Sequence, residues 1–177
     1  NLLNFNFVEL DLLSKEIQNN TLRDHPAIFE TTLAFLSDLL KIREINEIYN
    51  LSHLLNFFIY TLSLYILYKI FNKRYKSLSL SILFIIVIFF TPRFFAESFY
   101  NSRDIFFFSL FALFLYSVQK FLAKSTFRNI LLISFSSALL INAKVLGIIP
   151  VIVFLIMYLS YASDIKKENS KIFKEII

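Results

Sequence analysis

Two apolar runs decide the fold: LSLSILFIIVIFFT at Leu78–Thr91 and IFFFSLFALFLYSV at Ile105–Val118. Neither run contains a charged residue, and such runs are solvated well by lipid but aggregate in water. The whole chain agrees, because 57% of its 177 residues are hydrophobic, against about 45–50% in a soluble domain. Its mean hydropathy is +0.65. We therefore predict an all-α protein, a polytopic transmembrane helical bundle.

The predicted membrane region covers residues 51–163 and holds about five spans. A straight span needs about 20 residues, so the shorter second and fourth segments are expected to extend into their flanks or to meet a thinned part of the protein. One alternative merges residues 129–162 into a single re-entrant hairpin. Residues 164–177 form a cytoplasmic tail or the start of a further loop. The expected spans are residues 51–70, 78–92, 105–122, 129–143 and 146–162.

Residues 1–50 differ from the rest of the chain, since they hold eight acidic and four basic side chains. We predict that they form an external loop with amphipathic helices on or near the membrane surface. Pro26 separates the two helical stretches. Their apolar positions are Phe7, Leu10, Leu13 and Ile17 in the first stretch, and Ile28, Leu33, Leu36 and Leu40 in the second.

The placement of Lys and Arg predicts the topology. Four basic residues lie at 69–76, three at 120–128 and four in the tail. With five spans these segments share one side of the membrane, and the positive-inside rule places that side in the cytoplasm. Residues 1–50, a polar connection at 92–104 and the turn at 142–147 then face outward. The net charge of +5 is interpreted as this topology signal, and nucleic acid is rejected as a partner.

The polar residues expected outside gather in three segments, at 23–30, 92–104 and 142–147. Carboxylates, a His and cations at one end of a bundle suit the binding of a charged headgroup and acid–base chemistry. His53 and Asn56 lie at the outer end of the first span, where we expect them to make helix-end or interhelical hydrogen bonds. The chain has no cysteine, which excludes thiolate chemistry.

The segment 92–116, PRFFAESFYNSRDIFFFSLFALFLY, resembles the second external loop and following helix of the GT-C glycosyltransferases. These relatives include protein O-mannosyltransferases, aminoarabinose-to-lipid-A transferases and bacterial Rgt-type transferases. Many bacterial members read P-R-x-F/I-x-x-x-x-F-x-N-x-K/R-D-I-P at this place. Phe106 stands where the last Pro is usual. The matching positions are Pro92, Arg93, Phe95, Asn101, Arg103, Asp104 and Ile105.

Two further elements are similar to the family and follow its order. DHPAIFE at 24–30 is similar to the H-P-P or H-G-P-A-F-E element of the long first external loop. NAKVLG at 142–147 is similar to a T-R-x-x-G element, with Lys144 in place of Arg. The family also carries an acidic residue after its first transmembrane helix. Because the sequence starts at Asn1 and not at Met, we expect a fragment that lacks this helix, with Glu9 or Asp11 as the remnant of that acidic element.

The resemblance implies an enzyme, a glycosyltransferase in a bacterial inner membrane. It would transfer a hexosyl or pentosyl group from a polyprenyl-phosphate donor to a lipid or glycan acceptor on the external side. Asp104 and Glu97 are the catalytic carboxylates in this interpretation, and Asp104 is also the candidate ligand of a divalent metal, the one cofactor considered. The implied substrate and phosphate contacts are Arg93, Arg103, Asn101, Lys144, Asp24 and His25.

Each of these residues also has a plainer interpretation. Asp104 opens a helix, where the helix dipole favours an acid. Arg93 and Arg103 snorkel beside an aromatic belt, Lys144 is a loop lysine, and His25 is a structural or surface residue. For the whole chain, the alternatives are a transporter or flippase and a non-catalytic assembly protein of cell-envelope glycan synthesis.

Overall fold

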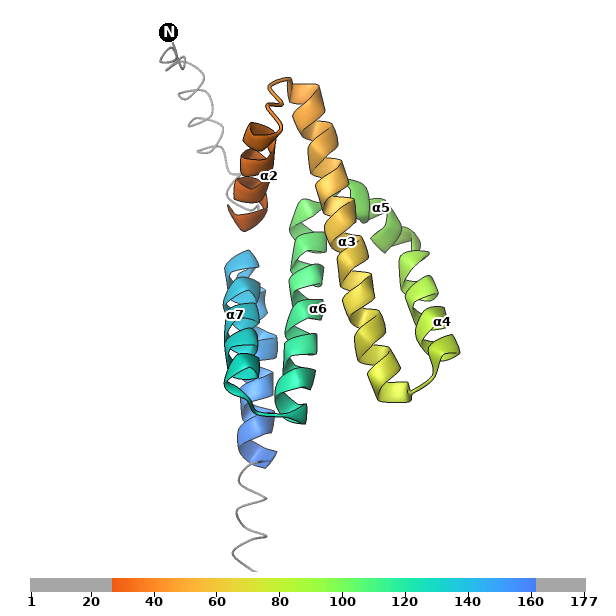
Figure 1. Ribbon diagram of the computed structural model, residues 1–177, viewed down its shortest axis with the longest axis vertical. Helices are drawn as coiled ribbons and strands as arrows, with labels where there is room; N and C mark the ends of the chain where they lie inside the picture. The colour runs from red at the N-terminus through yellow and green to blue at the C-terminus, as the bar shows by residue number, and fades with distance from the viewer. Residues whose placement is uncertain (1–26, 162–177) are drawn as a thin grey trace, which may run out of the picture.

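The computed structural model describes residues 27–161, and this part of the chain consists of helices joined by short connections, with no strand (Figure 1). A 3-10 turn at the start of the last described helix, Val145–Tyr161, is labelled η2. The elements in order are α2 (Ala27–Leu39), α3 (Ile45–Tyr75), α4 (Leu78–Phe89), α5 (Pro92–Tyr100), α6 (Ser102–Ala123), α7 (Phe127–Ala143) and η2 (Val145–Gly147).

Helix α6 is the centre of the bundle, with α3 packed along one side and α7 along another (Figure 1). Its two faces belong to two separate core clusters. Ile105 and Ala112 pack against Tyr60 and neighbouring residues of α3. Phe106 and Phe114 belong to the cluster that includes α7 and reaches α2. A helix that is apolar on opposite faces has to be covered on both, which explains its central place.

Helix α3 has 31 residues, which corresponds to about 46 Å and exceeds a hydrocarbon core of about 30 Å. It begins at Ile45, before the predicted start at Leu51, and continues to Tyr75. Glu47 lies in its first turn and basic residues in its last turn, a distribution that the helix dipole favours. Both helix ends therefore suit an aqueous or headgroup environment.

The polar connection expected at 92–104 is largely helical, because residues 92–100 form helix α5. Pro92 occupies the first helical position, where its missing N–H costs nothing and its fixed φ suits a helix. The same proline cannot continue α4, so the chain bends by 63° between the two helices. Asn101 then caps the start of α6.

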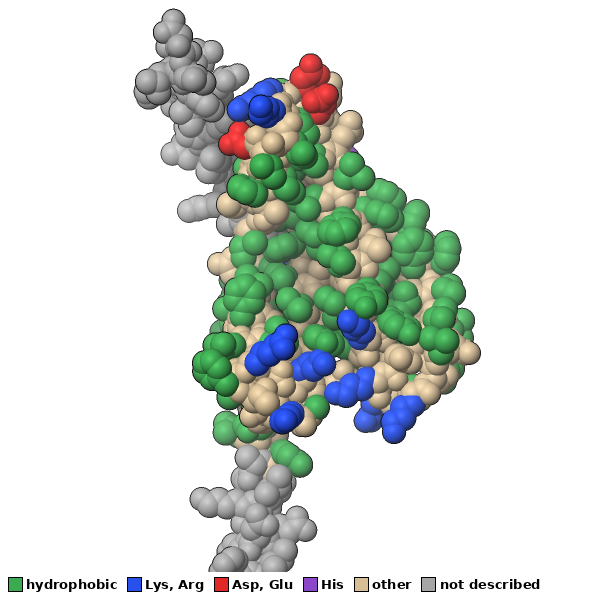
Figure 2. Space-filling view, in the orientation of Figure 1, with side chains coloured by type: hydrophobic (Ala, Val, Ile, Leu, Met, Phe, Trp, Pro, Cys, Tyr) green, Lys and Arg blue, Asp and Glu red, His purple; other side chains and the backbone are tan. Residues whose placement is uncertain are grey.

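By length and composition, α3 and α6 are each able to cross a membrane, and the bent pair α4–α5 is a third candidate. Helices α7 and Val145–Tyr161 are apolar but shorter. Within residues 27–161 the structure therefore confirms an all-α fold with two or three candidate membrane-spanning helices, and five spans stay a prediction. Figure 2 shows large hydrophobic side chains over most of the visible face, as lipid contact requires.

A helix, α2, lies at the place of the second predicted amphipathic stretch, and its position at the membrane surface stays a prediction. The buried positions are Phe29, Leu33 and Ser37, which follow one another at intervals of four residues on one helix face. Leu40 is exposed and lies after the helix. The first predicted amphipathic stretch, at residues 7–17, lies outside the described residues.

Candidate functional site

Five side chains that the sequence singled out form one continuous polar chain at the end of the bundle where α6 begins. Arg93 Nε donates to Glu97 Oε1 over 2.9 Å. Asn101 Nδ2 lies 3.4 Å from Glu97 Oε2 and 3.0 Å from Asp104 Oδ2. The ammonium of Lys144 donates to the other oxygen of Asp104. The chain of contacts thus connects α5, α6 and the end of α7.

Asp104 is positioned by the start of its own helix. Its backbone N–H donates to the side-chain oxygen of Asn101, the N-cap of α6, over 3.1 Å. The Asn101 amide in turn donates to the Asp104 carboxylate. This reciprocal arrangement resembles a capping box and orients the carboxylate toward Lys144. The plainer interpretation, an acid in the first turn of a helix, therefore holds together with the ion pair.

Lys144 is positioned by a close approach of two backbones. It is the C-cap of α7, and its carbonyl accepts from the N–H of Gly147 over 2.8 Å. Gly147 is the only glycine of the chain, and a Cβ there would lie 2.3 Å from the carbonyl oxygen of Leu140. Only glycine permits this contact, which turns the chain tightly enough to bring Lys144 back to α6.

The other end of the polar chain is held by α3. Asn56, which is 1% exposed, donates to the carbonyls of Ser98 over 2.9 Å and Glu97 over 3.3 Å. His53 donates from Nδ1 to the carbonyl of Phe99. These carbonyls lie in the last turn of α5, and the Glu97 carbonyl also accepts from the Asn101 backbone N–H over 2.9 Å. The expected interhelical role of His53 and Asn56 is confirmed.

Exposure differs along this chain of contacts. The Glu97 side chain is 17% exposed and its partner Arg93 is 82% exposed. Lys144 is 20% and Asp104 is 43% exposed, so the Asp104 carboxylate remains accessible from outside. Arg103 lies in the same first turn of α6. The remaining predicted contacts, Asp24 and His25, lie outside the described residues.

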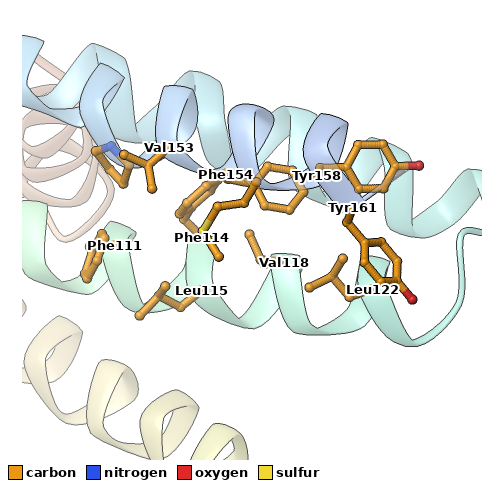
Figure 3. Close-up of a pocket in the computed structure, with 11 residues that line it drawn as sticks. Phe111, Phe114, Leu115, Val118, Leu122, Val153, Phe154, Tyr158 and Tyr161 are labelled. Atoms are coloured by element: carbon orange, nitrogen blue, oxygen red, sulfur yellow. The ribbon is translucent and has the colours of Figure 1, made fainter. Parts of the chain in front are cut away.

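An apolar groove lies between α6 and the last helix (Figure 3). Its main part has a volume of about 630 Å³ and is lined entirely by apolar and aromatic residues. A smaller part of about 370 Å³ shares three lining residues with it and extends toward the start of both helices. The shared residues are Phe111, Pro150 and Val153.

Phe107 joins the groove to the polar chain. Its ring lines the smaller part of the groove, and the ammonium of Lys144 lies 5.5 Å from the ring centroid. Phe107 carries no sequence signal of its own, although it lies three residues after Asp104 and hence on the same side of α6. A cation and a carboxylate thus stand at one end of an apolar groove.

A metal centre does not fit the described residues. Within 27–161 no three side chains of His, Cys, Asp or Glu gather closely enough to hold a metal ion. The Asp104 carboxylate is already engaged by an ammonium and an amide. A divalent metal at Asp104 stays a prediction, and we derive no chemical step through it.

Comparison with known proteins gives no match, whether with protein-family models, with curated proteins or with solved structures.

Proposed function

We propose that the chain belongs to a membrane glycosyltransferase of the GT-C type, which transfers a sugar from a polyprenyl-phosphate donor to an acceptor. The observation that supports this proposal most directly is the double contact of Phe107, beneath the Lys144 ammonium and inside the apolar groove. A donor with an anionic phosphate next to a long hydrocarbon chain matches a cation next to an apolar groove. The groove accommodates the hydrocarbon, and Lys144 meets the phosphate.

In this proposal the ion pair between Lys144 and Asp104 breaks when the donor binds, and each residue takes a new partner. The Lys144 ammonium turns to the donor phosphate, which leaves the Asp104 carboxylate free to accept a proton from the acceptor hydroxyl. The acceptor oxygen forms a bond to the anomeric carbon, and the bond from that carbon to the phosphate oxygen breaks. The electron pair stays on the phosphate, where Lys144 stabilises the added charge. Asn101 keeps the carboxylate oriented throughout.

The proposal is tested by filling the groove in the membrane-embedded full-length protein. Val153 lines both parts of the groove, so Val153→Phe is expected to block a long hydrocarbon chain. Transfer from a long-chain polyprenyl-phosphate sugar should fall at least about tenfold, whereas a donor with a short lipid chain should still react. The control is Ile152→Phe, at an exposed neighbouring position that does not line the groove.

Equal losses with long-chain and short-chain donors in Val153→Phe would contradict the role of the groove. No transfer by the wild-type protein from any lipid-linked sugar would contradict the proposed function itself.

A further inference from the structure

The end of the bundle opposite Asp104 carries an excess of positive charge. Figure 2 shows the Lys and Arg side chains of the visible face gathered mainly at the end where α3 and α6 terminate. In the sequence from 48 to 163 the only carboxylates are Glu97 and Asp104, and both belong to the opposite end. The cations of this basic end are Lys69, Lys73, Arg74, Lys76, Lys120, Lys124 and Arg128.

A pocket of about 570 Å³ lies at this end, between α6 and α7. Lys120 and Arg128 supply its cations, and Tyr116 lines it with its ring 5.3 Å from the Lys120 ammonium. Among the described residues neither cation pairs with a carboxylate. The rest of the wall is Asn129 together with the apolar side chains Leu131, Leu132 and Phe135.

The two helix ends that carry Lys120 and Arg128 are held together by the side chain of Asn129. Asn129 Nδ2 donates to the carbonyls of Lys120 over 3.2 Å and Lys124 over 2.8 Å. These bonds tie the end of α6 to the first turn of α7. Arg128 lies in that first turn, where there is no acidic residue and where the helix dipole disfavours a cation. A bound anion would relieve this unfavourable placement.

We propose that the pocket between α6 and α7 binds the phosphodiester headgroup of an anionic phospholipid through Lys120 and Arg128. Basic pockets between membrane helices are suited to such headgroups. The apolar wall continues from the cations along α7, and Leu131 and Phe135 are 54% and 61% exposed. A ligand held here therefore has its charge at the cations and its hydrocarbon along an apolar helix face, which is the chemistry of a phospholipid. This site is separate from Asp104 and from the proposed transfer reaction.

The test titrates the detergent-purified full-length protein with phosphatidylglycerol, phosphatidylcholine and soluble glycerol phosphate, with bound ligand measured by native mass spectrometry. Each cation that contacts the anionic headgroup directly contributes about fivefold to the affinity for the lipid. The double variant Lys120→Gln/Arg128→Gln should therefore bind phosphatidylglycerol about 25-fold more weakly, on the same scale. The matched control is Lys73→Gln/Arg74→Gln, which removes the same charge from the same end outside the pocket and should change affinity less than about twofold.

Three results would overturn the proposal. An equal loss in the control would assign the binding to general surface charge. Equal binding of phosphatidylcholine would remove the charge recognition, and glycerol phosphate binding as tightly as the lipid would make the ligand a free phosphate. If the double variant does not fold, Arg128→Gln alone changes one exposed side chain and should lose about fivefold, whereas an unchanged affinity would contradict the site.

Discussion

The ammonium of Lys144, at the end of α7, contacts the carboxylate of Asp104, in the first turn of α6, across 40 positions of sequence. This ion pair is the one side-chain contact that closes the polar chain between α5 and the turn at 144–147. It holds together the two segments that carry the candidate site, so its loss should affect both stability and function.

Replacement of Lys144 by Met should lower the free energy of unfolding in detergent micelles by about 1–2 kcal/mol, because a partly buried carboxylate loses a charged hydrogen-bond partner. The value is below that of a fully buried pair, since Asp104 is 43% exposed. Arg93→Met is the control, because its side chain is 82% exposed and exposed pairs contribute below about 1 kcal/mol. A larger effect of Arg93→Met would contradict the assignment.

Gly147→Ala should destabilise the protein by about 1–3 kcal/mol, as overpacking usually does. The added methyl group would lie 2.3 Å from the carbonyl oxygen of Leu140, and backbone atoms cannot move aside as a flexible side chain can. Thermal unfolding compares this variant with Val145→Ala, which changes a side chain that is 84% exposed in the same turn. Equal melting temperatures for both variants and the wild type would exclude the close approach.

The hydroxyls of Ser117 and Ser136 lie 2.7 Å apart between α6 and α7, and both side chains are fully buried. Hydrogen bonds between membrane helices contribute about 0.6 kcal/mol on average and up to about 1.7 kcal/mol. A double-mutant cycle of Ser117→Ala and Ser136→Ala should return a coupling energy in this range. Strictly additive effects would mean that the two helices do not meet here.

Asn56→Ala should cost about 1–3 kcal/mol, because it removes the side-chain donor of the Ser98 carbonyl in the last turn of α5. The matched control is Asn50→Ala on the same helix, where the side chain is exposed. Hydrogen exchange should accelerate in α5 in the first variant and not in the second. Unchanged exchange in α5 would show that Asn56 does not hold this helix in place.

Much of the architecture was accessible from the sequence because the relevant signals are local. The uncharged apolar runs predicted helices. Connections rich in Lys and Arg alternate along the chain with connections that have no such excess, and this alternation predicted that 92–104 and 142–147 lie at one end of the bundle. Asp104 and Lys144 meet there. Asn56 was predicted to make a helix-end or interhelical hydrogen bond because a polar side chain at the end of an apolar helix requires a partner.

Other features depend on tertiary packing and gave no local signal. Pro92 ends α4, but the same residue starts α5, and sequence alone did not distinguish a loop from a short helix. In α2 the side chain of Phe29 is buried and that of Leu40, just after the helix, is exposed. Which side chains are buried depends on where the neighbouring helices α3 and α6 contact α2. The apolar groove and the place of Phe107 beside Lys144 arise only when α6 and the last helix lie together.

The central claim is that Asp104 accepts the proton of the acceptor in sugar transfer. It is tested most directly by the rate of glycosyl transfer from a polyprenyl-phosphate sugar in membranes that contain full-length Asp104→Asn. A second variant, Asp104→Asn/Lys144→Gln, keeps a neutral hydrogen bond between the two positions and controls for stability. Both variants should remain folded and lose at least about 100-fold in turnover, as the removal of a general base predicts. Wild-type turnover in a folded Asp104→Asn protein would contradict the account.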